Sequence, residues 1–308
     1  MKILLAEYAT AVGLGGTYEV EGTAMLSTLA SSFQRCGHEV VYPTSGPRIE
    51  AGSAVLLSGA GGFEDFLASI SKEADAGLLI APDEMQAGFL EVLEDNTVNL
   101  GCSPEAARLC ADKLASTRVM KENGVPVAEI VPGPEPCECG CRQYVIKPRS
   151  GCGSEGVHIS SSARAPEGYI ATRYVSGMHL SASFVAGKGR FLPLTINRQL
   201  IEFEGEKISY NGSQVPYNTP RAGEIWEVAE KACRALGLSG YAGIDFVVGD
   251  LPRAVDVNAR PTTSLIGIVK VMQEEIADLL LAWRFGELPE RITIQGMHSF
   301  SKSDLGAQ

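Results

Sequence analysis

A glycine-rich segment near the middle of the chain constrains the fold more than any other feature. It reads Tyr144-Val-Ile-Lys147-Pro-Arg-Ser-Gly-Cys-Gly-Ser-Glu-Gly156, and residues 151–156 match the pattern GxGxxG. In a dinucleotide-binding fold a helix opens directly after these glycines, because its N-terminus binds the pyrophosphate. Here Val157-His-Ile159 favours a strand, and no Lys-Ser or Lys-Thr pair follows to complete a Walker loop. We therefore predict a glycine flap between two strands.

Such a flap suits phosphate binding. Its backbone amides can close over phosphate oxygens, with Lys147 as a point charge beside them. A simple glycine-rich hairpin turn is the alternative, and the Lys-Pro pair and two serines around three glycines argue against it. The candidate phosphate-binding residues are Lys147, Ser150, Gly151, Gly153, Ser154 and Gly156.

The first part of the chain alternates short apolar runs with helical patterns. Strands are predicted over residues 3–6, 39–42, 55–57 and 77–81, and helices over 22–37, 63–73, 86–94 and 104–123. This alternation is typical of an open α/β layer. The last of these helices has Ser103 as a plausible N-cap with proline after it, and it ends at Asn123-Gly124.

After Gly124 the pattern becomes rich in strands. Strands are predicted over residues 144–147, 157–160, 168–174, 179–186, 191–199, 241–248 and 253–257, and helices over 222–236 and 264–285. The predicted fold class is therefore α/β in front and α+β in the body.

Composition narrows the classes of function. Lysine and arginine number 26 against 37 acidic residues, a net charge of −11, which disfavours nucleic-acid binding. The sequence has no apolar run long enough for a membrane span, and an acid at Glu7 interrupts any secretory leader. Eight irregularly spaced cysteines do not resemble a secreted disulfide framework. We expect a cytoplasmic protein.

The sequence does not decide the role of a cluster of three cysteines or of one further cysteine. The run Cys137-Glu-Cys139-Gly-Cys141 is tighter than the spacing of structural zinc pairs, so reduced surface thiols are favoured over a metal or redox site. Cys152 lies inside the flap, and we hypothesise that its oxidation affects activity.

A third polar segment follows near the end. It runs Gly243-Ile-Asp245-Phe-Val-Val-Gly-Asp-Leu-Pro-Arg-Ala-Val-Asp256-Val-Asn258-Ala-Arg260 across two predicted strands. Asp256 and Asn258 are two residues apart and share a face. Two carboxylates and an amide oxygen suit Mg²⁺, and Arg260 can then contact a phosphate. The alternative is a polar hairpin face, but Asp245 lies in an apolar strand where an unpartnered charge is costly.

Lys113 is the remaining anomaly. At roughly 100° per residue it falls on the apolar face of the predicted 104–123 helix. For a lone lysine, a stem lying along apolar surface would be the preferred interpretation. The second lysine before the flap weakens that interpretation.

The order of a helical lysine, a lysine before a glycine flap, and Asp…Asp-x-Asn-x-Arg resembles the ATP-grasp superfamily from about residue 101 to 286. The resemblance implies two α+β subdomains that clasp ATP, over about 113–171 and 175–295 of a 101–300 domain. A small open α/β domain over 1–100 would precede it, and 301–308 would be a tail. A protein kinase puts its lysine after the glycines and needs His-Arg-Asp and Asp-Phe-Gly, which are absent.

The resemblance also implies roles for residues. ATP would contact Lys113, Lys147 and the flap, and a hinge of Thr172, Arg173, Tyr174 and Val175 would pair with adenine. Mg²⁺, or Mn²⁺ in its place, would bind Asp245, Asp256 and Asn258, while Lys147 and Arg260 would serve catalysis. The sequence departs from the family pattern at three positions. Thr172 and His179 stand where ribose-binding glutamates are common, and Asp256 stands where the metal ligand is usually Glu. His179 is either a ribose contact or a strand histidine.

The N-terminal segments Leu4-Leu-Ala-Glu7-Tyr8-Ala-Thr-Ala-Val-Gly13 and Glu19-Val-Glu21-Gly-Thr-Ala-Met25 resemble the tyramine–L-glutamate ligase family of methanofuran biosynthesis. That resemblance implies phosphorylation of the glutamate γ-carboxylate by ATP and attack by tyramine. Glu7 either binds a substrate ammonium group or faces water. Substrate carboxylates have three candidate partners, Arg149, Arg198 and Arg260.

Several alternatives stay open at this point. Another amino-acid or dipeptide ligase fits the same motifs, and a nucleotide-binding regulatory protein without turnover fits the three departures. An NAD(P) oxidoreductase is disfavoured by the missing helix. We expect small-molecule acid and amine substrates, no nucleic acid and no membrane, with a homodimer left open by the resemblance.

Overall fold

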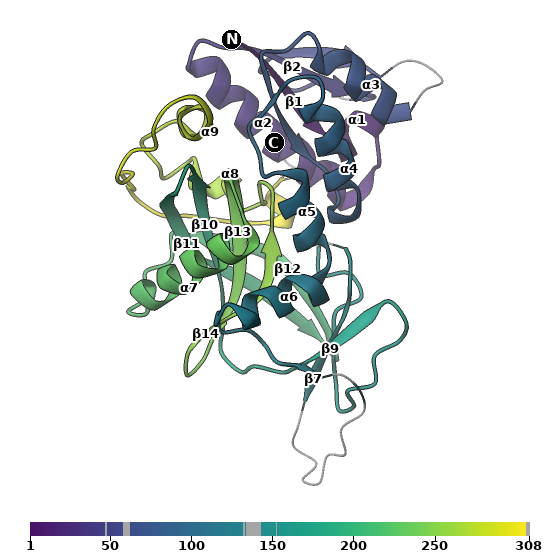
Figure 1. The fold of residues 1–308 in the computed structure, drawn as a ribbon, viewed down its shortest axis with the longest axis vertical. Helices are drawn as coiled ribbons and strands as arrows, with labels where there is room; N and C mark the ends of the chain where they lie inside the picture. Colours follow the sequence, from purple (N-terminus) through teal and green to yellow (C-terminus); the bar gives the residue numbers. More distant parts are fainter. Residues whose placement is uncertain (47, 58–61, 132, 134–142, 152, 306–308) are drawn as a thin grey trace.

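The computed structural model describes residues 1–46, 48–57, 62–131, 133, 143–151 and 153–305. Figure 1 shows the first hundred residues as one layered unit above a larger body rich in strands. The predictions made for Cys137, Cys139, Cys141 and Cys152 fall outside the described residues.

The first unit is built on a five-stranded parallel sheet with the strand order β3-β2-β1-β4-β5. Apolar residues run almost continuously along its central strands, as expected for a sheet covered on both faces. Leu4 and Leu79 pack with helices α3 and α4 on one face, whereas Ile3 and Leu78 pack with α2 on the other. The elements are β1 (Lys2–Glu7), α1 (Tyr8–Val12), α2 (Gly16–Arg35), β2 (Glu39–Thr44), β3 (Ser53–Leu56), α3 (Gly62–Ser71), β4 (Ala76–Ile80), α4 (Asp83–Glu94) and β5 (Val98–Asn99).

The body is built on an antiparallel sheet in the order β14-β13-β10-β11-β12-β8-β7-β9-β6, with β15 also paired to β12. One register pair, Lys207 with His158, joins β12 to β8. The strands are β6 (Ile130–Val131), β7 (Tyr144–Pro148), β8 (His158–Ser160), β9 (Tyr169–Arg173), β10 (Met178–Gly187), β11 (Arg190–Glu204), β12 (Lys207–Val215), β13 (Gly240–Val248), β14 (Pro252–Asn258) and β15 (His298–Ser301). The helices are α5 (Pro104–Ala111), α6 (Lys113–Glu122), α7 (Ala222–Leu236), α8 (Leu265–Ile268), α9 (Ile276–Phe285) and α10 (Lys302–Leu305).

The predicted class, an α/β unit followed by an α+β body, is confirmed by these two sheets. Two predicted helices are wrong as single elements. The 104–123 helix is interrupted at Asp112, which has φ −95° and ψ 98° and whose carboxylate accepts hydrogen bonds from the amides of Leu114 and Ala115. Asp112 therefore ends α5 and caps α6.

The 264–285 helix is likewise divided into α8 and α9. Between them the amide of Gln273 donates to the carbonyl of Thr293, and the amide of Gln295 donates to the carbonyl of Val271. These bonds to a distant segment replace the helical ones that periodicity alone predicts.

The structure also differs from the prediction in two further strands, in the start of one helix and at the C-terminal end of the described chain. Strands β12 and β15 were not predicted, and α2 begins at Gly16 rather than at residue 22. Residues 301–305, expected as part of a tail, complete β15 and form α10. Ser301 pairs with Gly212, and Leu305 is buried against the core beside α2. No helix in the part of the chain that the structure describes is both long and apolar enough to cross a membrane.

Leu280 on α9 offers a test of this packing, because it is fully buried where α9 meets α2. Leu280→Ala removes core contacts and leaves a cavity, so the free energy of unfolding should fall by about 2–5 kcal/mol. Urea denaturation measures it. The same substitution at Leu56, which is 56% exposed, should change stability by less than about 0.5 kcal/mol. Equal losses for the two variants would contradict the burial of Leu280.

Candidate functional site

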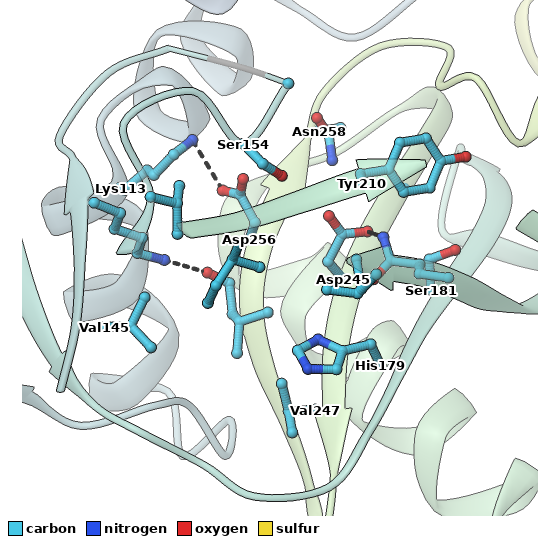
Figure 2. A pocket seen from close by; sticks show the side chains of 18 of the residues that line it. Lys113, Val145, Ser154, His179, Ser181, Tyr210, Asp245, Val247, Asp256 and Asn258 are labelled. Carbon is cyan, nitrogen blue, oxygen red and sulfur yellow. Dashed lines mark hydrogen bonds and ion pairs between the residues drawn. The ribbon is translucent and has the colours of Figure 1, made fainter. Parts of the chain in front are cut away.

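A pocket lies between helix α6, the glycine flap and the strands β7, β9, β10, β13 and β14 (Figure 2). One end is apolar, with Val247 near His179 and Val145 on the opposite side, and the other end carries the charged side chains and Ser154. The predicted residues that line it are Lys113, Lys147, Gly151, Gly153, Ser154, Thr172, Arg173, Tyr174, Val175, His179, Asp245, Asp256, Asn258 and Arg260. An apolar end beside a charged end suits a molecule with an aromatic ring and a polyanionic tail.

The charged end is organised around Lys113. Since Asp112 breaks the helix, Lys113 becomes the first residue of α6, and its side chain enters the pocket. Its Nζ lies 3.1 Å from Asp256 Oδ1 and donates to the carbonyl of Gly151 at 2.9 Å. Burial alone would lower the Lys113 pKa, but the carboxylates of Asp256 and Asp83 outweigh it and raise that pKa. Lys113 is therefore a buried, charged lysine that also touches the flap.

Lys147 is the second buried lysine. It lies on β7, directly before the flap, and its Nζ donates to the carbonyl of Val255 at 2.5 Å. Its pKa is lowered, first by burial and with a contribution from nearby Lys113, although Asp256 opposes the shift. A phosphate oxygen would supply the negative charge that Lys147 lacks in this environment.

Asp245 and Asp256 are opposite each other on β13 and β14, at a bulge in the pairing. Burial and the neighbouring Asp256 raise the pKa of Asp245 to about 7, although Gln199 Nε2 donates to its Oδ1 at 3.0 Å. Asp256 behaves differently: burial would raise its pKa, but Lys113 and Lys147 hold the pKa below its usual value.

The donor chemistry of Asp245, Asp256 and Asn258 fits a hard divalent cation. All three line the pocket through oxygen-bearing side chains, and the unfavourable charge of Asp245 is what an added cation would relieve. Within the described residues no group of three His, Cys, Asp or Glu side chains forms a self-sufficient metal cluster. The set therefore matches Mg²⁺, which uses few protein ligands and shares phosphate oxygens.

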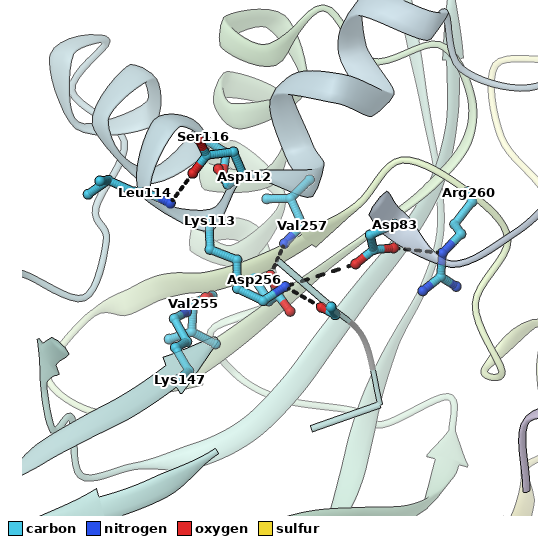
Figure 3. A network of polar contacts seen from close by, with 11 residues as sticks. Asp83, Asp112, Lys113, Leu114, Ser116, Lys147, Val255, Asp256, Val257 and Arg260 are labelled. Carbon is cyan, nitrogen blue, oxygen red and sulfur yellow. Dashed lines mark hydrogen bonds and ion pairs between the residues drawn. The ribbon is translucent and has the colours of Figure 1, made fainter. Parts of the chain in front are cut away.

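Asp83, which sequence reasoning missed, does not line the pocket but contacts two charged residues at this end of it, Lys113 and Arg260 (Figure 3). Its Oδ1 accepts a hydrogen bond from Arg260 Nε at 2.9 Å, and its Oδ2 lies 4.0 Å from Lys113 Nζ. Asp83 is the first residue of α4, just beyond the carboxyl end of β4. Its position just after a buried parallel strand could have identified Asp83 from the sequence, because ligand-binding residues gather at the carboxyl ends of such strands.

A second pocket lies on the other side of the flap. It shares Gly151, Gly153 and Arg260 with the first pocket, and its walls come from β1, α2, β9 and the segment after β4. Ser150 and Gly156 line this second pocket rather than the first. Its carboxylates are Glu7, Glu21, Glu84 and Glu155, and its apolar and aromatic residues include Leu14, Tyr18, Met25, Ile80 and Tyr169.

Glu7 is a buried member of that second pocket, so a water-facing loop carboxylate is wrong. It ends β1 and is 5% exposed. Its carboxylate caps α1 by accepting hydrogen bonds from the amides of Ala9 and Thr10 and from the Thr10 hydroxyl at 2.6 Å. Burial raises the pKa of Glu7 against these hydrogen bonds.

Two predicted arginines lie outside both pockets. Arg149 is exposed and pairs with Asp112, Nη2 to Oδ2 at 2.5 Å. Arg198 is exposed on β11 and lies over the ring of Tyr217, because its neighbour Gln199 takes the pocket-facing position and successive strand residues alternate in direction. Of the three arginines predicted to bind substrate carboxylates, Arg260 is therefore the one that lines the pockets.

The predicted hinge connects β9 to β10 along the apolar end of the pocket. Thr172 is buried in β9, paired with Val145 and Ile130. The amide of Tyr174 is already used by the carbonyl of Gln143 at 2.9 Å. His179 is partly buried beside Phe203, and burial lowers its pKa. His179 is thus predominantly neutral at neutral pH at the end of the pocket away from Lys113.

Comparison with known proteins places this site in a family context. Residues 110–264, just over half of the chain, match the family described as ATP-grasp domain. The tyramine–L-glutamate ligase of Methanocaldococcus fervens is 29% identical over 215 residues, which cover 68% of this chain and 66% of that protein. The chain therefore matches just under two thirds of that relative's length.

Two further similarities agree with the first. The D-alanine–D-alanine ligase of Maridesulfovibrio salexigens is 24% identical over 264 residues, covering 69% of this chain and 86% of that protein. A crystal structure described as an ATP-grasp superfamily protein from Archaeoglobus fulgidus superimposes with a TM-score of 0.76 at 26% identity, over 95% of this chain and 90% of that one.

Asp245 gives a prediction with a definite sign. Because its pKa is raised to about 7 in the fold, the unfolded chain releases this proton first, and the group costs stability as pH rises from about 4 to 7. In the absence of divalent cations, Asp245→Asn should therefore be more stable than the unaltered protein at pH 8 and gain much less at pH 4.

Denaturant unfolding in a chelator at the two pH values measures the difference. Asp250→Asn is the matched control, because Arg253 lowers the pKa of this exposed aspartate to about 2, so its replacement should bring no gain at pH 8. An Asp245→Asn effect of the same size at both pH values would contradict the raised pKa.

Proposed function

The chain belongs to the ATP-grasp family, and from that premise we propose that it is an ATP- and Mg²⁺-dependent ligase that joins a carboxylate to an amine. The observation that carries the proposal is the charged end of the first pocket. There Lys113, Lys147 and Arg260 meet Asp245, Asp256 and Asn258 beneath a glycine flap. Cations for phosphate and oxygen ligands for a divalent cation are what phosphoryl transfer needs.

The two ends of the first pocket support a proposed orientation of ATP. Adenine lies at the apolar end against Val145 and Val247, next to hinge residues 172–175. The phosphates lie at the charged end, between the amides of the flap and the two buried lysines. Mg²⁺, with Mn²⁺ as an alternative, would bind Asp245, Asp256 and Asn258 and neutralise phosphate charge there. His179 is close enough to the hinge to stand beside the ribose.

The second pocket then receives the acid and the amine. A carboxylate oxygen attacks the γ-phosphorus, the bond to ADP breaks, and an acyl phosphate forms. The amine attacks the acyl carbon, phosphate leaves, and the amine loses a proton. Arg260 lies at the boundary of the two pockets, where it contacts the phosphoryl group during both steps. Catalysis comes from positioning and from charge stabilisation.

Glutamate and tyramine are the favoured substrates. The N-terminal resemblance and the 29% identical relative both support this pair. A second pocket with four carboxylates and several apolar and aromatic side chains also suits an aromatic amine. A dipeptide ligase is the second candidate, supported by the similarity to a D-alanine–D-alanine ligase.

Release of ADP and phosphate from Mg-ATP tests the proposal. The assay offers glutamate with tyramine, and in parallel a panel of other amino acids and amines, with mass spectrometry of the products. Release that requires glutamate and tyramine together, with one amide product, is the expected result. Release with two amino acids only would favour the dipeptide ligase. ATP binding without release for any pair would contradict a ligase and favour a regulatory protein.

Lys147→Met tests the role of the second lysine in the same assay. The change keeps an apolar stem of similar length but removes the charge that faces the phosphates, so kcat/KM should fall by about 100- to 1,000-fold. Lys231→Met is the matched control, since Lys231 also donates to a backbone carbonyl, that of Gly124, on the exposed side of α7. Lys231→Met should keep full activity. A Lys147→Met variant as active as the control would disprove the assignment.

A further inference from the structure

We propose that Asp83 is a positioning residue that holds Lys113 and Arg260 in the arrangement that receives the transferring phosphoryl group. This inference rests on the proposed ligase function, which supplies the phosphoryl transfer. Asp83 does not line the first or the second pocket, so it acts through the two cations. It belongs to the parallel-sheet unit, whereas the residues proposed to contact ATP come from the body.

The carboxylate of Asp83 lies between the two cations. Figure 3 shows Lys113 on one side of it and Arg260 on the other. Arg260 Nε donates to Oδ1 at 2.9 Å, while Lys113 Nζ lies 4.0 Å from Oδ2. Each carboxylate oxygen of Asp83 thus faces a different cation, and Asp83 is the partner that Lys113 and Arg260 share.

Burial strengthens the interactions between these charges. The side chains of Lys113, Asp83 and Arg260 are 6%, 10% and 12% exposed, so water screens their charges poorly. Together with Asp256 they form an alternating chain of Asp256, Lys113, Asp83 and Arg260, with two negative and two positive charges. Removing one member of a buried chain leaves its neighbours uncompensated.

Asp83 also offsets a repulsion inside the pocket. Lys113 and Arg260 both lie beside the Asp83 carboxylate, so two like charges are brought close together in a poorly screened setting. Without Asp83 the two cations would repel each other across the space where the phosphoryl group must lie. Asp256 and the carbonyl of Gly151 would still hold Lys113. Arg260 would lose the hydrogen bond from Nε that ties it to the same carboxylate as Lys113, and would keep the bond from Nη1 to the carbonyl of Pro261.

Asp83→Asn tests the positioning role, because it keeps the shape and removes the charge. We expect kcat to fall by about 10- to 100-fold, as for other residues that orient a catalytic group, while the affinity for ADP changes less because the adenine end is untouched. Asp83→Glu, which restores the carboxylate, should recover part of kcat. Glu91→Gln is the matched control: it lies on the same helix and loses an exposed pair with Arg108, and it should keep full activity.

Chemical labelling of arginines gives a second measurement that does not need turnover. Phenylglyoxal labelling, followed by peptide mass spectrometry, reports how accessible each guanidinium is to the reagent. In Asp83→Asn the labelling of Arg260 should rise relative to that in the unaltered protein, because its Nε loses its carboxylate partner. The labelling of Arg221, which contacts Glu224 and the carbonyl of Gly249 rather than Asp83, should stay close to its original rate. General unfolding would raise both, and thermal denaturation checks this independently.

The two measurements separate the two proposals. A selective rise at Arg260 with a fall in kcat supports the positioning role, and a selective rise without turnover in any protein supports it while the ligase proposal fails. Unchanged kcat or unchanged Arg260 labelling in folded Asp83→Asn overturns it. A loss of kcat that Asp83→Glu does not restore, with Arg260 and Arg221 labelled equally faster, also overturns it in favour of a purely structural residue.

Discussion

The ion pair between Lys113 and Asp256 is the contact on which the rest of the site depends. It joins the start of α6 to β14 in a buried setting, and Lys113 reaches the flap carbonyl of Gly151 from the same position. The pair exists because Asp112 breaks the helix and turns Lys113 into its first residue. The extended backbone at Asp112 thus places Lys113 where it contacts both the flap and the sheet at the charged end of the pocket.

The Lys113–Asp256 ion pair makes the two facing aspartates, Asp245 and Asp256, differ in pKa. Asp256 is compensated by lysines and keeps a low pKa, whereas Asp245, which has Gln199 as its neutral hydrogen-bond partner, has a pKa of about 7. An uncompensated carboxylate next to a compensated one is a costly arrangement in a protein without a bound cation. The divalent cation proposed for this site would relieve the cost of the charged Asp245.

Residues close in sequence were predictable, and those joined only by folding were not. Motif order and strand alternation indicated Lys147, the flap and the Asp256–Asn258 pair, and Lys147, Asp256, Asn258 and part of the flap line the first pocket. Asp83 carries no local motif, and it meets Arg260 across 177 positions of the chain. Arg198 was predicted from residue type alone, yet its orientation depends on a register that the irregular pairing of β11 with β12 shifts near Gln199. The break at Asp112 was missed because helical periodicity continues through it.

The two pockets share part of their walls. Gly151, Gly153 and Arg260 line both pockets, so the flap separates them without isolating them. A phosphoryl group bound at the charged end of the first pocket is therefore adjacent to whatever carboxylate occupies the second. Asp83 anchors Arg260 at this boundary from the parallel-sheet unit, and Glu7 ends a strand of the same sheet in the second pocket. In the proposed reaction that sheet, which holds none of the residues proposed to contact ATP, would thus set the position of the acceptor relative to the phosphate it receives.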